Sequence, residues 1–133
     1  MSGLASRIVF TGVLKDVRPV LRLTDVLVLP TTEREGLSVA LVEGSCAGIP
    51  LIGSRLGGIP EVVEDGVNGI LVEPGSAAEL GDALAMLLSS PDLRKRMGQS
   101  GRGIYESRFS SAHMMTQIHA LYDRELQRKN HAL

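Results

Sequence analysis

The chain has 133 residues and almost balanced charge, with 14 Lys and Arg against 15 Asp and Glu, which gives a formal net charge of −1. This balance provides no field that would attract nucleic acid or an anionic membrane. Hydrophobic residues make up 44% of the chain and aromatic residues 3%, so we expect one domain with an aliphatic core. The single cysteine, Cys46, excludes an internal disulfide and is expected to be a buried thiol. Because no leader pattern or membrane-spanning apolar run is visible, a soluble cytoplasmic protein is expected.

Short runs of β-forming residues alternate with helical patterns, which is typical of an α/β domain with a parallel sheet. The first predicted strand covers residues 7–11 and ends at Gly12. A short helix is predicted over residues 16–23, with Asp16 as its N-cap and Pro19 in its first turn. Further strands are predicted at residues 26–29, 51–53 and 70–72.

Four more segments have the position or the apolar spacing of helices. They cover residues 38–47, 76–88, 92–106 and 111–126. In the first of them, the small residues Gly44, Ser45 and Ala47 would let the helix approach the sheet closely. Since no internal repeat or low-complexity linker interrupts the pattern, residues 1–133 are expected to form a single Rossmann-like, three-layer domain.

The segment from Glu35 to Glu43 follows the strand at residues 26–29 and runs into the next helix. Ligands of open α/β sheets bind beyond the carboxyl ends of the strands, and a helix N-terminus there suits phosphate. Gly36 would allow close approach of the backbone or a positive φ, and Ser38 would cap the helix through its hydroxyl. The two carboxylates could accept hydrogen bonds from sugar and ribose hydroxyls. On spacing alone, two ordinary surface glutamates explain this pattern somewhat better.

The motifs around this segment change that interpretation. They are, in order, RIVFTG (7–12), DVLVLP (25–30), EGLS (35–38), LVEG (41–44), AGIPLI (47–52), GGIPEVV (57–63), DGVNGILV (65–72) and FS (109–110). Together they resemble the C-terminal, donor-binding domain of family 4 (group 1) glycosyltransferases, which are retaining enzymes of the GT-B fold. The resemblance covers nearly the whole chain with the right gaps, and the combination is highly specific.

The resemblance implies a role for several residues. Glu35 matches the family's glutamate that contacts donor-sugar hydroxyls and is often discussed as catalytic, and Glu43 matches the glutamate that holds the ribose. The backbone of the turn at Gly36, Leu37 and Ser38 matches the part that touches the sugar and diphosphate. The loop at Gly12 and Val13 matches a region that often borders the base.

No cofactor and no metal are implied, because the nucleotide diphosphate sugar is itself the donor substrate. The chain has no Asp-x-Asp pair. Its three histidines, His113, His119 and His131, have no metal-like partner set in the sequence. The turn at Gly57 and Gly58 is expected to be structural.

The resemblance also implies that the chain is part of a larger enzyme. Family members have an acceptor domain, two earlier strands and a Gly-Arg…Lys segment that neutralises the diphosphate, and nothing here matches these parts. In the strand order 3-2-1-4-5-6, the strands at residues 7–11 and 26–29 would each lose a neighbour. We therefore expect residues 7–11 to move beside residues 26–29 in a four-stranded parallel sheet. The expected partner is the N-terminal acceptor domain or a second copy in a homodimer, and the isolated chain is expected to lack turnover.

Three functions stay open at this point. The leading one is the nucleotide-sugar-binding part of a retaining glycosyltransferase. The alternatives are a non-catalytic interaction module that retains the fold and a fragment of a GT-B nucleotide-sugar epimerase. The Gly-Leu-Ser turn and the glutamate spacing favour the transferase over the epimerase.

Overall fold

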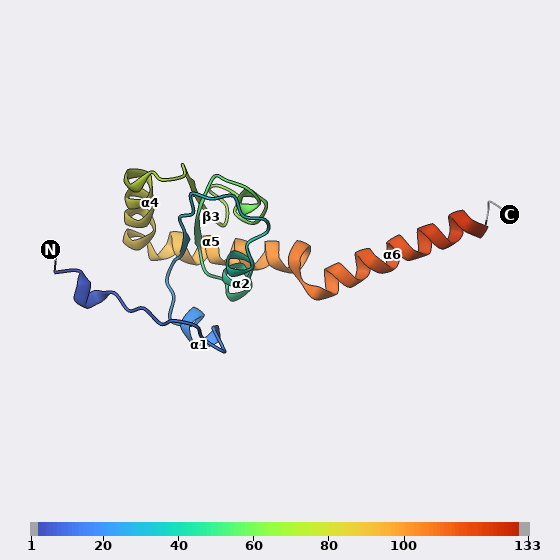
Figure 1. The fold of residues 1–133 in the computed structure, drawn as a ribbon, viewed down its shortest axis with the longest axis horizontal. Coiled ribbons are helices and arrows are strands. Elements are labelled where there is room, and N and C mark those ends of the chain that lie inside the picture. Colours follow the sequence, from blue (N-terminus) through green and yellow to red (C-terminus); the bar gives the residue numbers. More distant parts are fainter. Residues whose placement is uncertain (1–2, 131–133) are drawn as a thin grey trace.

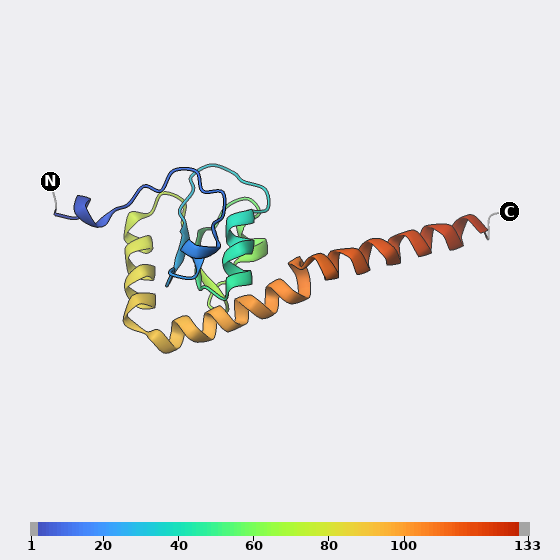
Figure 2. The same ribbon diagram turned by 90° about the horizontal axis from the view of Figure 1, so that it is seen from below.

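The computed structural model describes residues 3–130 and shows helices packed around a central sheet, with an extension at each end (Figures 1 and 2). The centre of the body is a parallel sheet of β1 (Leu27–Leu29), β2 (Leu51–Ser54) and β3 (Gly69–Val72) in the order β1-β2-β3. Leu27 pairs with Leu51, and Leu51 in turn pairs with Gly69. Three of the four predicted strands are therefore confirmed, each within one residue of its expected start.

Helical elements precede, connect and follow these strands. They are η1 (Ala5–Arg7), α1 (Arg18–Leu21), α2 (Val39–Ala47), α3 (Ile59–Val62), α4 (Ala77–Ser89), α5 (Pro91–Ile104), the π-helical turn η2 (Tyr105–Phe109) and α6 (Ser111–Asn130). Ser76 and Ser90 cap α4 and α5 by accepting hydrogen bonds from the backbone N–H groups of Glu79 and Leu93. These two helices and α6 confirm the helical spacing in the sequence.

The sheet is covered on both faces, because successive side chains of β2 point to opposite sides. Leu51 packs with Leu41 of α2 and with the α3 residues Ile59 and Val62. Ile52 packs on the other face, in a cluster with Val72, Ala83, Leu87 and Met97. This arrangement confirms the three-layer α/β fold.

Gly44 explains how α2 approaches the sheet so closely. A Cβ at this position would lie 2.9 Å from Leu51 Cδ2 and 3.1 Å from Leu27 Cδ1. Since Leu51 is fully buried in the core, a larger residue at this position would require the leucine side chains or α2 to shift. The close approach expected from the small residues of this helix is confirmed at Gly44.

The predicted fourth strand was wrong. Residues 7–11 form no strand, and within residues 3–130 the sheet has three members, with β2 as the neighbour of β1. Val9 is 82% exposed and Phe10 is 93% exposed. A strand in a parallel sheet needs cover on both faces, and side chains as exposed as these two lack such cover.

The helix predicted over residues 16–23 is shorter, and its N-cap is Val17 instead of Asp16. The Asp16 carboxylate lies one residue earlier, where it accepts a hydrogen bond of 3.0 Å from the backbone N–H of Arg18. Pro19 lies in the first turn as expected. The carboxylate thus supports the start of α1 from outside the cap position.

The last helix, α6, projects away from the body (Figures 1 and 2). Ser110 has extended backbone angles of φ −67° and ψ 147°, which end η2 and turn the chain. Its hydroxyl accepts a hydrogen bond from the backbone N–H of His113 at 3.2 Å, so it caps α6. Among the helices within residues 3–130, none is both long and apolar enough to cross a membrane.

Candidate functional site

The start of α2 lies beyond the carboxyl end of β1, where residues 30–38 connect the two elements. Ser38 is the N-cap residue, with φ −77° and ψ 111°, but its side chain makes no capping hydrogen bond. The predicted capping role of its hydroxyl was therefore wrong, although the helix boundary was right. Ser38 is 7% exposed, whereas the next residue, Val39, is 68% exposed. The N-terminal turn of α2 thus meets solvent without a serine cap, where its N–H groups and helix dipole can attract an anion.

Gly36 has neither a left-handed backbone conformation nor a close neighbour where a side chain would lie. It is not among the glycines with positive φ, and a Cβ built on it would meet no atom within 4 Å. The left-handed conformation is found instead at Gly12, with φ 62°, and at Gly57, with φ 59°. Gly36 therefore leaves open space beside the loop, and this space is where a ligand could approach the backbone.

The loop at Glu35 is tied to the carboxyl end of β2. The backbone N–H of Gly58 donates a hydrogen bond of 3.0 Å to the carbonyl oxygen of Glu35. The side chains of Glu35 and Leu37 remain exposed to solvent. The turn expected to be structural thus also contacts the candidate site.

Glu43 and Gly12 line the same cavity, which has a volume of about 280 Å³. Apolar residues of α1 and β1, including Val20, Leu21 and Leu27, form much of the remaining wall. Because Gly12 lies 31 positions before Glu43, the fold brings together two site residues that were predicted separately.

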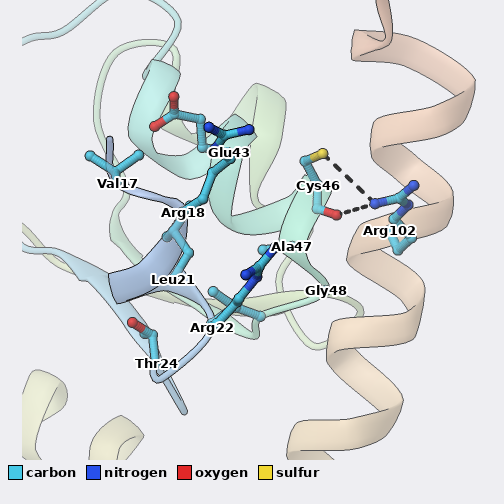
Figure 3. Close-up of a pocket in the computed structure, with 11 residues that line it drawn as sticks. Val17, Arg18, Leu21, Arg22, Thr24, Glu43, Cys46, Ala47, Gly48 and Arg102 are labelled. Carbon is cyan, nitrogen blue, oxygen red and sulfur yellow. Dashed lines mark hydrogen bonds between the residues drawn. The ribbon is translucent and has the colours of Figure 1, made fainter. Parts of the chain in front are cut away.

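Glu43 also borders a larger cavity of about 680 Å³ between α1, α2 and α5. Figure 3 shows Arg18 of α1 and Arg22, the residue after α1, together with Glu43 and Cys46 of α2, around this space. Sequence reasoning missed the two arginines, since nothing in their spacing links α1 to the Glu35–Glu43 segment.

Arg18 is already engaged by a carboxylate. Its Nε lies 2.8 Å from Asp16 Oδ1, with side-chain exposures of 78% and 45%. Hydrogen bonds from the Arg18 side chain and backbone lower the pKa of Asp16 to about 2, and the same contact raises the pKa of Arg18. The pair is therefore charged at neutral pH and largely neutralises itself.

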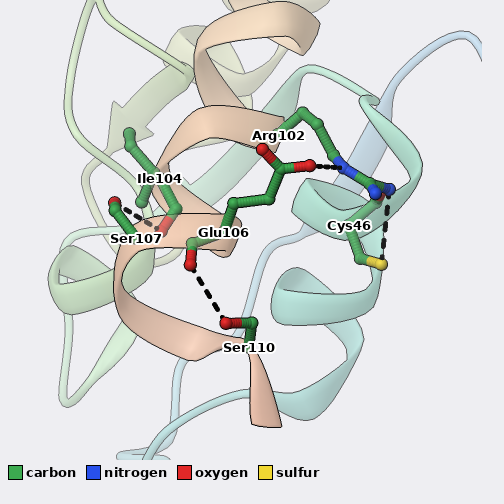
Figure 4. Close-up of polar contacts among 6 residues, drawn as sticks. All are labelled: Cys46, Arg102, Ile104, Glu106, Ser107 and Ser110. Carbon is green, nitrogen blue, oxygen red and sulfur yellow. Dashed lines mark hydrogen bonds and ion pairs between the residues drawn. The ribbon is translucent and has the colours of Figure 1, made fainter. Parts of the chain in front are cut away.

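Arg102 connects α5 to the end of α2 (Figure 4). It donates hydrogen bonds to the Cys46 carbonyl oxygen and, at 3.8 Å, to Cys46 Sγ. Its Nε lies 2.7 Å from Glu106 Oε1, and its guanidinium lies 5.7 Å from the centre of the Tyr105 ring. Cys46 is half-buried, not fully buried as expected. An arginine that binds carbonyls at a helix C-terminus also opposes the negative end of the helix dipole.

Other predicted residues are less closely associated with these cavities. Val13 is fully exposed, and Glu35 lies on the connecting loop, outside the cavities that Glu43 borders. His113 and His119 lie in α6, and His131 falls outside the described residues. Within residues 3–130, no group of three or more His, Cys, Asp or Glu side chains could hold a metal ion.

Comparison with known proteins places this fold and these motifs in one family. Residues 1–90 match the family described as "Glycosyl transferases group 1". The chain is 33% identical over 116 residues to N-acetyl-alpha-D-glucosaminyl L-malate synthase of Bacillus anthracis, covering 87% of this chain and 30% of that protein. The chain thus spans about a third of the length of the curated relatives it matches.

Solved structures of similar proteins agree with this family assignment. HepE of Anabaena, solved in complex with UDP, has a TM-score of 0.86 and 26% identity, and the match covers 92% of this chain and 34% of HepE. The C-terminal domain of the group 1 protein LpcC from Francisella tularensis has a TM-score of 0.72 and 29% identity, over 82% of this chain and 57% of that domain's chain. The neighbours are GT-B glycosyltransferases, as the resemblance implied. This chain belongs to the group 1 glycosyl transferases.

Proposed function

We propose that the chain is the nucleotide-sugar-binding part of a retaining glycosyltransferase, in which a sugar is transferred from a nucleotide diphosphate donor. The observation that carries this proposal is the shared cavity of Gly12 and Glu43 beside the uncapped start of α2. HepE, a relative of similar fold, was solved with UDP and with UDP-glucose, which supports a uridine nucleotide among the candidates.

Each part of such a donor has a matching group in this region. The N–H groups in the first turn of α2 suit the diphosphate, because they lack a serine cap and lie at the positive end of the helix dipole. Glu43 follows Ser38 by five residues, or about 7.5 Å along the helix axis. Its carboxylate can therefore accept hydrogen bonds from ribose hydroxyls while the phosphates remain at the helix start. Glu35, on the loop before α2, is assigned to the sugar hydroxyls and to catalysis.

Turnover by the isolated chain is not expected. Departure of the nucleotide diphosphate demands stabilisation of negative charge, and the backbone N–H groups in the first turn of α2 are the groups we assign to it. Arg18 is close to Glu43 but is paired with Asp16. We therefore propose weak donor binding with no measurable transfer, and no cofactor or metal.

Exposed apolar side chains favour an additional partner. Residues 8–23 include Phe10, Val13 and Leu23, each at least 85% exposed, and the outer edge of β1 has no strand beside it in the described part of the chain. Such an edge is a template for another chain. We propose that an acceptor domain or a second copy covers this side. The same observation supports a second candidate function, an interaction module without catalysis.

Calorimetric titration with UDP, GDP, ADP and their common sugar conjugates tests the donor site. We expect saturable binding to one base series, and loss of that binding in Glu43→Ala. Asp82→Ala is the matched control, because Asp82 is an exposed carboxylate within α4, away from both cavities. Absence of binding at millimolar ligand, with the chain folded, would reject the donor site and leave the interaction module as the better account.

A further inference from the structure

The turn at Gly57 and Gly58 holds the loop at Glu35 by direct backbone contact. Gly58 is buried, and its N–H donates to the carbonyl oxygen of Glu35 at 3.0 Å. The two segments are 23 residues apart in sequence and lie at the carboxyl ends of neighbouring strands, β1 and β2.

The contact leaves no room for side chains on the turn. A Cβ on Gly58 would lie 2.6 Å from the carbonyl oxygen of Gly36 and 3.1 Å from the backbone nitrogen of Leu37. A Cβ on Gly57 would overlap the carbonyl oxygen of Glu35, and Gly57 also has a left-handed φ of 59°. Backbone cannot turn aside as the end of a flexible side chain can, so either substitution must displace the loop or the turn.

Other glycines in turns do not share this environment. Gly66 has a φ of 78°, but a Cβ there would meet nothing within 4 Å. Gly75 has a φ of 79°, and its nearest neighbour would be the Thr32 side chain at 3.8 Å. These two glycines serve only the conformation of their own turns, whereas Gly57 and Gly58 also make room for the backbone of residues 35–37.

The turn is firmly anchored, while the loop it holds is exposed. Gly58 leads directly into α3, where Ile59 and Val62 are 0% exposed in the core cluster. On the other side of the contact, Glu35, Gly36 and Leu37 are all exposed. Because the buried segment is the more rigid of the two, it determines where the exposed loop lies.

We propose that Gly57 and Gly58 are positioning residues that hold Glu35 and Gly36 in the conformation that receives the donor sugar. This inference rests on the proposed donor site, and it assigns the nucleotide part and the sugar part of the donor to different segments of that site. Glu43 and the α2 start bind the nucleotide part, whereas the glycine turn controls the part of the affinity that depends on the sugar.

The test compares Gly58→Ala and Gly57→Ala with the control Gly81→Ala, whose Cβ would meet nothing within 4 Å in α4. Two quantities are measured for each folded variant: amide hydrogen exchange of residues 31–38, and the affinity ratio between a nucleotide diphosphate and its sugar conjugate. We expect at least about fivefold faster exchange and at least about a fivefold loss of the sugar-dependent affinity, on the scale of one lost backbone hydrogen bond. Affinity for the bare nucleotide should stay unchanged, and Gly81→Ala should keep the wild-type exchange of residues 31–38 and the wild-type affinity ratio.

The outcomes separate this inference from the donor site itself. If the wild-type chain binds no nucleotide, the proposed function fails, and exchange alone decides whether the turn holds the loop. Unchanged exchange in a folded Gly58→Ala overturns the inference, as does an equal loss of nucleotide and sugar-conjugate affinity. Should both glycine variants fail to fold, hydrogen exchange of the Gly58 amide in the wild-type chain decides whether the contact with Glu35 forms. Protection like that of the β2–β3 ladder supports the contact, and exchange at the rate of a free loop contradicts it.

Discussion

Asn68 is a single side chain that holds the turn between α3 and β3. It is 0% exposed, its Oδ1 accepts a hydrogen bond of 2.7 Å from the Glu64 N–H, and its Nδ2 donates one of 2.8 Å to the Val62 carbonyl oxygen. Gly66 and Gly69 indicate a turn in the sequence, but no local pattern shows that the asparagine between them points inward. Such a side chain satisfies two backbone groups that would otherwise lose their partners.

Replacing Asn68 should therefore be costly. In Asn68→Ala, a partly buried backbone donor and a buried acceptor lose the Asn68 side chain as partner, so we expect a loss of about 2–4 kcal/mol in the free energy of unfolding. Urea denaturation followed by circular dichroism measures it. The exposed Asp82→Ala should stay within about 0.5 kcal/mol of wild type, and an equally small change in Asn68→Ala would contradict the assigned hydrogen bonds.

Asp65 has a predictable effect on how the stability of the fold depends on pH. Burial opposes ionisation of its carboxyl group, but the Leu71 N–H and Arg55 outweigh burial and lower the pKa below its usual value. Arg55 Nη2 lies 3.0 Å from Asp65 Oδ2. Because the folded pKa is the lower one, Asp65 stabilises the fold above its unfolded pKa of about 3.9 and loses this effect as pH falls through the folded value.

The corresponding experiment compares the urea midpoints of wild type and Asp65→Asn between pH 7 and pH 2. We expect the wild-type midpoint to fall more steeply below about pH 4, because the variant has no carboxyl group to protonate at this position. Asp82→Asn leaves the contacts of Asp65 with Leu71 and Arg55 intact, so this control should keep the steep fall. Identical slopes in Asp65→Asn and wild type would refute the lowered pKa.

At the scale of elements, the packing of α5 against the end of α2 depends on Gly98. This glycine is buried, and a Cβ there would overlap the carbonyl oxygen of Gly48, the left-handed residue that ends α2. Arg102, one turn further along α5, binds the Cys46 carbonyl oxygen. The helices thus meet through backbone, with no side chain between them at this point.

Two alanine substitutions in α5 should have opposite effects. Gly98→Ala should lower the free energy of unfolding by about 1–3 kcal/mol through overpacking. Gly103→Ala, where a Cβ would meet nothing within 4 Å, should raise it by about 0.5–1 kcal/mol, because alanine is the better helix former. Thermal or urea unfolding of both variants checks the pair. Stabilisation by Gly98→Ala would show that α5 does not cross α2 as described.

The elements that could be predicted from the sequence are those whose signals are local. The apolar spacing of α4 and α5 placed these helices, and the apolar runs at β1, β2 and β3 placed the strands. The segment at residues 7–11 has an equally strong strand pattern, but a strand also needs a neighbour and cover on both faces, which no local pattern encodes. The Ser38 hydroxyl does not cap α2 for a similar reason, since the direction in which it points depends on how the preceding loop enters the helix.

In the candidate site, too, the features with local signals could be predicted, and those that depend on distant segments could not. The Glu35–Glu43 segment could be identified because its residues are close in sequence and carry the family's motifs. The contact from Gly58 to Glu35 and the cavity shared by Gly12 and Glu43 arise only when distant segments come together. Without a structure, the steric need for glycine at residues 57 and 58 could not be separated from ordinary turn chemistry.

At the scale of the whole molecule, an extension leaves the body at each end (Figure 1), and exposed apolar side chains occur on both the N-terminal segment and α6. On the N-terminal side these include Phe10, at 93% exposure, and Leu23, at 85%. On α6 they include Met114, Leu121 and Leu126, at 49–59% exposure. Exposed apolar surface of this kind favours association, in keeping with the predicted homodimer or acceptor-domain partner.

Sedimentation velocity over a concentration series tests this expectation. We expect wild type to associate with itself at high concentration when no other partner is present, and Phe10→Ser combined with Leu23→Ser to weaken that association. Because both side chains lie outside the two core clusters, the unfolding midpoint should hardly change. A wild-type chain that stays monomeric at every concentration would argue against the homodimer and leave the acceptor domain as the proposed partner.

The most direct test of the donor site is a titration of the isotope-labelled 14.2 kDa chain with UDP-glucose, followed by amide chemical shifts. The account predicts that the shifted amides cluster at Gly12, in the turn from Gly36 to Ser38 and in the first two turns of α2 up to Glu43. It also predicts that Glu43→Ala removes these changes without altering the rest of the spectrum. Shifts confined to α4 and α5, or none at saturating ligand, would contradict a nucleotide-sugar site at the start of α2.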